Sequence, residues 1–181
     1  ETKYGYASAD NQNIASVFID GESVCAGYSK AMEYILKDMG LFCTVVDGQA
    51  KDRGAHEWNL VKMNDQYYYV DVTWDDPGFA DADDHENCIE YTFFGITTDE
   101  LLINHTIDDP LGGIAQCTAT ENNYFVHEGK LFGADGMRDF ITGLKQSIAR
   151  GDKDYCARFS SSDLLDTAVL TMSNTDLSGY T

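Results

Sequence analysis

The segment HEWNLVKMNDQYYYVDVTW, residues 56–74, constrains the fold of this chain more than any other stretch. It is rich in β-branched and aromatic residues, which favour strands, and Asn64-Asp65 is its only turn signal. The pattern predicts an antiparallel hairpin that turns at these two residues.

The length of the hairpin loop decides which side chains share a face. A loop of two or four residues centred on Asn64-Asp65 sets His56 opposite Thr73 and Trp58 opposite Asp71. Side chains alternate between faces, so His56 and Asp71 become diagonal neighbours within side-chain reach, whereas a three-residue loop would separate them. Asp71 lies among apolar residues, where a carboxylate needs a specific partner. His56, taken alone, is equally consistent with a hydrogen-bonded histidine of the sheet.

A helix is predicted over residues 24–39, where apolar side chains recur at helical spacing and Gly40 supplies the stop. Ser23 is the expected N-cap. Cys25 then lies in the first turn, where unpaired backbone N–H groups and the positive end of the helix dipole stabilise a thiolate. We therefore expect Cys25 to be reactive.

The remaining patterns indicate an α+β fold. Strands are predicted at 41–48 and 91–96, and a capped helix begins at Thr97. Beyond residue 116 we expect a hairpin around Glu128-Gly129, a helix at 137–149, a strand at 155–160 and a capped helix at 161–172. The predicted architecture is a helix packed on an antiparallel sheet in residues 1–115, followed by a small α/β extension in residues 116–181.

Composition narrows the possible partners. The 181 residues carry a formal net charge of −19, which disfavours nucleic acid and anionic membranes. No apolar run is long enough to cross a bilayer, so we expect no membrane insertion. The acidic loop 75–88 could gather calcium, but it lacks the residue order of an EF-hand loop, and a solvated loop is favoured. We expect neither a metal nor a cofactor.

The other cysteines and histidines are assigned no catalytic role. Cys43 lies in the apolar run LFCTVV and is expected to be a buried thiol. No role follows from the sequence for Cys88, Cys117 and Cys156, and no zinc-ribbon spacing is present. Surface or core positions are expected for His85, His105 and His127.

The segments GESVCAGYSKAMEYILKDMG, GAHEWNLV and YYYVDVTWDDP, together with HTIDDP, resemble the transglutaminase-like superfamily, a branch of the papain-like thiol enzymes. The resemblance covers roughly residues 14–110. It implies that Cys25 is the nucleophile, His56 the base and acid, and Asp71 the carboxylate that orients the imidazole. Only 24 residues precede Cys25 and the chain begins at Glu1 without a methionine, so we expect an upstream segment to be missing or replaced.

The resemblance implies a thiol acyl-transfer enzyme, most simply a cysteine peptidase or amidase acting on a protein or peptide, including cell-wall peptides, in an extracellular or cell-surface bacterial setting. Two alternatives stay open: a protein-glutamine transamidase, and a cell-surface binding module that keeps the fold without chemistry. Three aromatic residues are candidates for lining a substrate groove, against the alternative that they pack in the core: Tyr28, Trp58 and Trp74.

Overall fold

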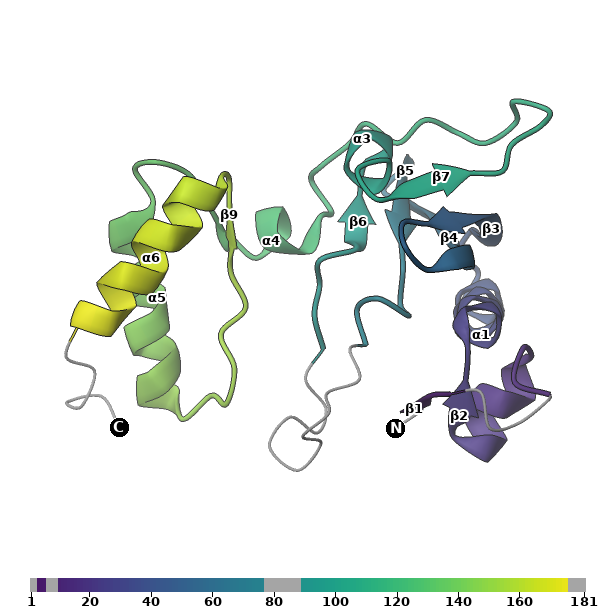
Figure 1. Cartoon of the computed structure of the whole chain (residues 1–181), viewed down its shortest axis with the longest axis horizontal. Helices are drawn as coiled ribbons and strands as arrows, with labels where there is room; N and C mark the ends of the chain where they lie inside the picture. Colours follow the sequence, from purple (N-terminus) through teal and green to yellow (C-terminus); the bar gives the residue numbers. More distant parts are fainter. Residues whose placement is uncertain (1–2, 6–9, 77–88, 176–181) are drawn as a thin grey trace. The chain divides into compact units, whose positions relative to one another are not determined.

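A computed structural model describes residues 3–5, 10–76 and 89–175 (Figure 1). The chain divides into two compact units, residues 1–123 and 124–181. Residues 116–123, which the sequence pattern assigns to the C-terminal extension, are part of the first unit. The first unit is a mixed α/β fold built on an antiparallel sheet, and it carries the candidate site.

The sheet of the first unit has five strands in the order β6-β5-β4-β3-β7, with every neighbouring pair antiparallel. Its strands are β3 (Cys43–Ala50), β4 (Gly54–Met63), β5 (Gln66–Val70), β6 (Phe94–Ile96) and β7 (His105–Ile107). The predicted strand at 91–96 is therefore shorter, and the predicted strand at 41–48 begins and ends two residues later.

The hairpin β4–β5 turns at Asn64-Asp65 as predicted, and its loop has two residues, one of the two lengths that put His56 and Asp71 on the same face. Met63 pairs with Gln66 and Asn59 with Val70, which is the register expected for a loop of two or four residues. Asn64 and Asp65 have φ of 50° and 63°. Two consecutive residues with positive φ form the turn whose twist matches that of the flanking strands.

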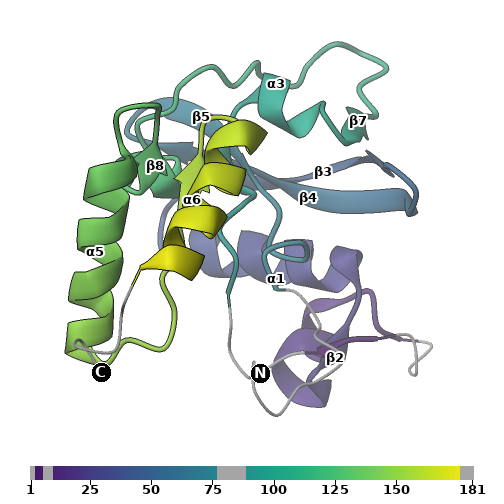
Figure 2. The same ribbon diagram turned by 60° about the vertical axis from the view of Figure 1, so that its left-hand side comes forward.

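Helix α1 (Cys25–Asp38) packs against β3 and β4, as Figures 1 and 2 show. Its C-terminal end agrees with the prediction, since Gly40 follows with φ of 78°. The predicted N-cap is wrong: Val24 occupies that position without a side-chain cap. Ser23 is fully buried, and its hydroxyl hydrogen-bonds the backbone oxygen of Asn11 and the hydroxyl of Ser16. Ser23 thus ties α1 to the preceding segment.

The two faces of the sheet carry separate apolar clusters because side chains alternate along each strand. On one face Val61, Tyr68 and Val70 pack with Met32 and Leu36 of α1. Cys43 joins this cluster and is fully buried, as predicted. The other face holds a second cluster: Val46, Trp58, Leu60, Tyr69, Phe93, Ile96, Leu101 and Cys117. The sheet is thus the centre of the hydrophobic core.

Two short segments complete the first unit. Helix α3 (Thr98–Leu101) begins at a capping box in which Thr97 and Glu100 bond each other's backbone, as its sequence predicts. At the N-terminus, β1 (Lys3–Tyr4) and β2 (Glu22–Ser23) form a parallel pair beside the single helical turn η1 (Ser16–Asp20).

The second unit contains α4 (Tyr124–His127), β8 (Leu131–Phe132), α5 (Met137–Arg150), β9 (Arg158–Phe159) and α6 (Ser162–Asn174). Both long helices match their predictions, and Ser161 caps α6 by accepting a hydrogen bond from the Leu164 N–H. The hairpin predicted around Glu128-Gly129 is wrong. The Glu128 N–H bonds the Tyr124 carbonyl in a helical turn, and β8 pairs with β9 in parallel instead.

Among the helices of the described residues, none is both long and apolar enough to cross a membrane. The predicted acidic loop 75–88, with His85 and Cys88, lies outside the described residues except for Asp75 and Asp76. Asp75 is buried and accepts a hydrogen bond from the backbone N–H of Phe93.

Candidate active site

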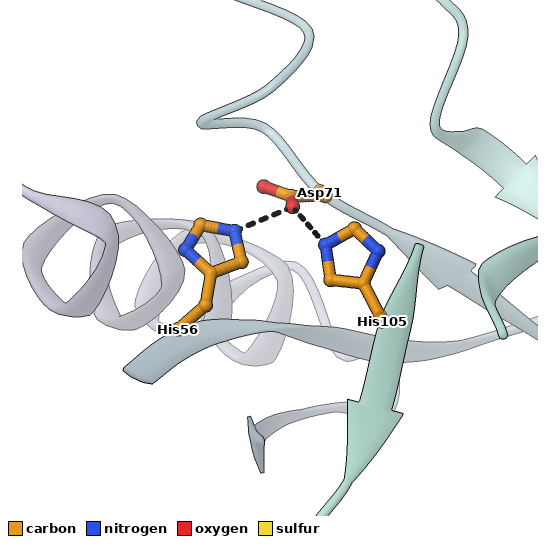
Figure 3. Close-up of side chains that lie close together, drawn as sticks. All are labelled: His56, Asp71 and His105. Atoms are coloured by element: carbon orange, nitrogen blue, oxygen red, sulfur yellow. Dashed lines mark hydrogen bonds and ion pairs between the residues drawn. The ribbon is translucent and has the colours of Figure 1, made fainter. Parts of the chain in front are cut away.

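Cys25, His56 and Asp71 come from three different segments of the first unit and meet at one end of the sheet. Cys25 begins α1, His56 lies on β4, and Asp71 directly follows β5. The hairpin register brings His56 Nε2 to 2.7 Å from Asp71 Oδ2 (Figure 3). The structure therefore places together the three residues singled out from the sequence.

The Asp71 carboxylate ends β5 and folds the chain back. Its Oδ1 accepts hydrogen bonds from the backbone N–H groups of Thr73 and Trp74, at 3.0 and 3.2 Å. Asx turns of this kind compete with the strand ladder, which explains why β5 stops at Val70. The carboxylate is almost completely buried, with 1% of Asp71 exposed. Its position is thus fixed by the turn as well as by His56.

The imidazole of His56 joins Asp71 to Cys25. Since Nε2 faces Asp71, Nδ1 is the nitrogen available for the hydrogen bond with the Cys25 thiol. Desolvation opposes a charged ring, but the hydrogen bonds to Asp71 and Cys25 outweigh it and raise the pKa of His56 to about 9. The ring is therefore stabilised as an imidazolium at neutral pH.

The pKa of Cys25 is shifted in the opposite direction, downward. Burial by itself would raise the pKa of its thiol, but the hydrogen bond from His56 and those from the backbone N–H groups of Glu57 and Ala26 lower it below its ordinary value. For Asp71, desolvation is likewise outweighed by the interactions with His105 and His56, which lower the pKa of the carboxyl. The site thus favours a thiolate, an imidazolium and a carboxylate in series.

The buried thiols provide the contrast. Desolvation raises the pKa of Cys43 and of Cys117 to about 11. A thiol with that pKa is ionised in roughly one molecule in ten thousand at pH 7. Both residues are free cysteines and fully or almost fully buried. They behave as small hydrophobic side chains, whereas Cys25 is half-buried and activated.

A groove of about 1030 Å³ reaches the triad at His56. Trp74 forms one wall and Arg53 lies over its ring, 5.8 Å from the centroid. Asp76 and Glu90 line the same groove. Its walls therefore combine an aromatic surface with charges of both signs.

The three aromatic candidates for substrate contact differ in their surroundings. Trp74 lines the groove. Tyr28 is buried and donates a hydrogen bond to Asp76 Oδ2 at 2.9 Å, so it can act on the groove through that carboxylate. Trp58 requires a correction: its side chain is completely buried in the apolar cluster and exposes no surface to a ligand.

His105 was missed as a neighbour of the site. The sequence suggested only a surface or core histidine without a catalytic role. The residue begins β7, is buried, and places Nε2 3.5 Å from Asp71 Oδ2. The only local sign of a strand at this position is that His105 begins the short β-compatible run HTI. Its approach to Asp71 depends on the pairing of β7 with β3, which are distant in sequence.

His56, Asp71 and His105 are also the group of described residues whose ligand atoms could surround a metal ion, since these atoms lie within 4.8 Å of one another. Two ligands of one tetrahedral zinc ion, each about 2.0–2.1 Å from it, are about 3.3 Å apart. The 2.7 Å between His56 Nε2 and Asp71 Oδ2 instead matches a charge-assisted hydrogen bond. This distance favours a proton shared in a hydrogen bond between His56 and Asp71 over a metal ion bound by both.

Comparison with protein-family models and with curated proteins finds no match. Among solved structures, the chain is similar to one described as "Crystal structure of a TGase", with 20% sequence identity and a TM-score of 0.37. The match covers 43% of this chain and 24% of that chain, so it spans about a quarter of the solved protein.

Proposed function

We propose that this protein is a thiol acyl-transfer enzyme with a papain-like arrangement of Cys25, His56 and Asp71. The observation that carries the proposal is the continuous hydrogen-bonded series from a buried carboxylate through an imidazole to a cysteine at the start of a helix. Nucleophilic catalysis needs these roles in this order: a nucleophile, its base, and a group that orients the base.

In the first half-reaction the Cys25 thiolate attacks an amide carbonyl and forms a C–S bond. Backbone N–H groups at the start of α1, which have no partner within a helix, are the proposed donors to the oxyanion. The C–N bond then breaks, and imidazolium His56 gives its Nδ1 proton to the leaving amine. An acyl-thioester and a neutral imidazole remain.

In the second half-reaction His56 takes a proton from water, which attacks the thioester and releases the acid and the thiolate. This makes the protein a cysteine peptidase or amidase. An amine that attacks in place of water would form a new amide, which is transamidation. We propose hydrolysis of protein or peptide substrates outside the cell, including cell-wall peptides, and the experiment below includes the amine alternative.

The first test measures which thiol is activated. Limiting iodoacetamide at pH 7 followed by peptide mapping should label Cys25 before Cys43 and Cys117, because a thiolate is the reacting species. In the His56→Ala variant the pKa of Cys25 should return towards its reference value of about 8.5, so the labelling rate at pH 6 should fall at least tenfold. A rate that is the same in both proteins from pH 5 to 9 would contradict the proposal.

The second test identifies the acyl acceptor. Peptide libraries incubated with and without a primary amine separate cleavage from amine incorporation by mass spectrometry. Cys25→Ser serves as the control, since its hydroxyl is a far weaker nucleophile at neutral pH. If the wild-type protein forms neither product and Cys25 is not activated, the result favours the non-catalytic binding module.

A further inference from the structure

A second histidine contacts the carboxylate of the proposed triad. His105 lies at the start of β7 and is 2% exposed, so it is shielded from solvent. Figure 3 shows its ring and that of His56 directed at the same carboxylate from two different strands. The mechanism described above requires only His56, which leaves the role of His105 to be explained.

The hydrogen bonds of Asp71 leave one position for His105. Oδ1 accepts from the Thr73 and Trp74 N–H groups, and Oδ2 accepts from His56. An ionised carboxylate offers about four acceptor positions. The remaining position on Oδ2 faces His105 Nε2 at 3.5 Å.

The surroundings of His105 determine where its proton lies. Nε2 is a buried nitrogen with no other hydrogen-bond partner. If Nε2 carried no proton, two lone pairs would face each other in a dry interior, which is unfavourable. A proton on Nε2 removes this conflict. Nδ1 lies 2.7 Å from Oδ1 of Asn104, an oxygen that can only accept. A proton on Nε2 alone therefore requires the Asn104 amide to be turned by half a rotation, so that its NH₂ group takes the place of Oδ1 and donates to Nδ1.

Aromatic side chains hold the ring of His105 in place. Its centroid lies 4.6 Å from that of Trp74, 5.1 Å from that of Trp58 and 5.6 Å from that of Phe93. Close packing of this kind restricts rotation of the ring. Nε2 is therefore kept in one direction, toward Asp71.

We propose that His105 is a positioning residue that donates a hydrogen bond from Nε2 to Asp71 Oδ2 and thereby fixes the carboxylate in the orientation that presents His56 to Cys25. The proposal rests on the proposed function. The series of side chains is then Asn104, His105, Asp71, His56 and Cys25. Although burial opposes ionisation, the hydrogen bond from His105 also contributes to the lowered pKa of Asp71.

The alternative is a histidine that only fills the core, and two substitutions separate the two roles. His105→Phe keeps the aromatic volume but has no donor. His105→Gln can place its NH₂ group near the position of Nε2. A hydrogen bond to a charged group contributes enough that its loss should lower the alkylation rate of Cys25 at pH 6 about tenfold in His105→Phe. In His105→Gln the rate should stay within about threefold of the wild-type rate.

His127→Phe is the matched control, because this histidine is exposed and belongs to the second unit, and its rate should equal that of the wild type. Equal losses in His105→Phe and His105→Gln, or no loss in either, would overturn the proposal. Circular dichroism of each variant shows whether it is folded.

A measurement on the unaltered protein does not depend on the variants. Two-bond ¹H–¹⁵N correlation spectra report which ring nitrogen of each histidine is protonated. We expect His105 to carry a proton on Nε2 at neutral pH, whereas a proton on Nδ1 alone would overturn the proposal. This result is independent of whether Cys25 is reactive, so failure of the proposed function can be distinguished from failure of the inference about His105.

Discussion

The charge of His56 depends on the carboxylate behind it. Asp71 is buried and ionised, and its interaction with the ring is a main reason why the pKa of His56 reaches about 9. The imidazolium is the form that can protonate a leaving amine. Because the folded pKa is raised, this form is present at neutral pH and is lost as the pH rises through about 9.

Asp71→Asn tests this dependence. The NH₂ group of Asn can donate to His56 Nε2 and so stabilise the wrong tautomer, while a neutral amide no longer raises the pKa of the ring. We expect turnover to fall about 10³–10⁴-fold and the basic limb of kcat/KM to move from near pH 9 to lower pH. A folded variant with an unchanged rate and an unchanged basic limb would mean that Asp71 is only structural.

At the scale of elements, the edge strand β7 carries His105 to the site. Residues 48–50 of β3 pair with it, and Gly48 lies opposite Ile107. A Cβ at Gly48 would come to 1.9 Å from the Thr106 carbonyl oxygen and 2.5 Å from the Trp58 ring. Glycine is therefore needed here for close approach of two backbones.

We expect Gly48→Ala to displace β7 and to lower the free energy of unfolding by about 1–3 kcal/mol, as overpacking does elsewhere. The shift should also weaken the contact of His105 with Asp71, so that Cys25 alkylation slows. Gly113→Ala is the control, because a Cβ there meets no atom within 4 Å. Urea denaturation and alkylation rates are the measurements. Equal stability of the two variants would show that β7 can adjust without loss.

The whole molecule consists of two units, and the last residues of the first unit, 116–123, pack against its core. Cys117 is almost completely buried, and its backbone exchanges two hydrogen bonds with Thr98. Asn122 donates a hydrogen bond to the hydroxyl of Tyr68 on β5. Residues 116–123 thus cover part of the core that supports the sheet.

Two truncations locate this boundary. A fragment of residues 1–123 should fold and keep the alkylation rate of Cys25, because it retains the contacts within the first unit. A fragment of residues 1–115 loses the buried Cys117 and its hydrogen bonds, and its unfolding free energy should be lower by about 2–4 kcal/mol. Thermal denaturation compares the two. Equal melting temperatures would support a boundary at residue 115 instead.

Local patterns in the sequence predicted the helix that carries Cys25 and the hairpin that turns at Asn64-Asp65, but they left the length of the hairpin loop open. Helical spacing and a two-residue turn act over a few residues, and alternation along a strand then decides which side chains share a face. For a loop of two or four residues these rules put the carboxylate next to the imidazole, and the two-residue loop of the structure meets that condition. The catalytic roles of the three residues stay a prediction.

The approach of His105 to Asp71, the burial of Trp58 and the inclusion of Cys117 in the first core were decided only by the tertiary structure. Each depends on segments that are far apart in the chain, such as β3 with β7. Such pairings are selected by the packing of the whole unit, because the entropy lost in closing a long loop is recovered only when many distant contacts form together. A histidine in a run of three strand residues carries no local sign of the partner that it will meet.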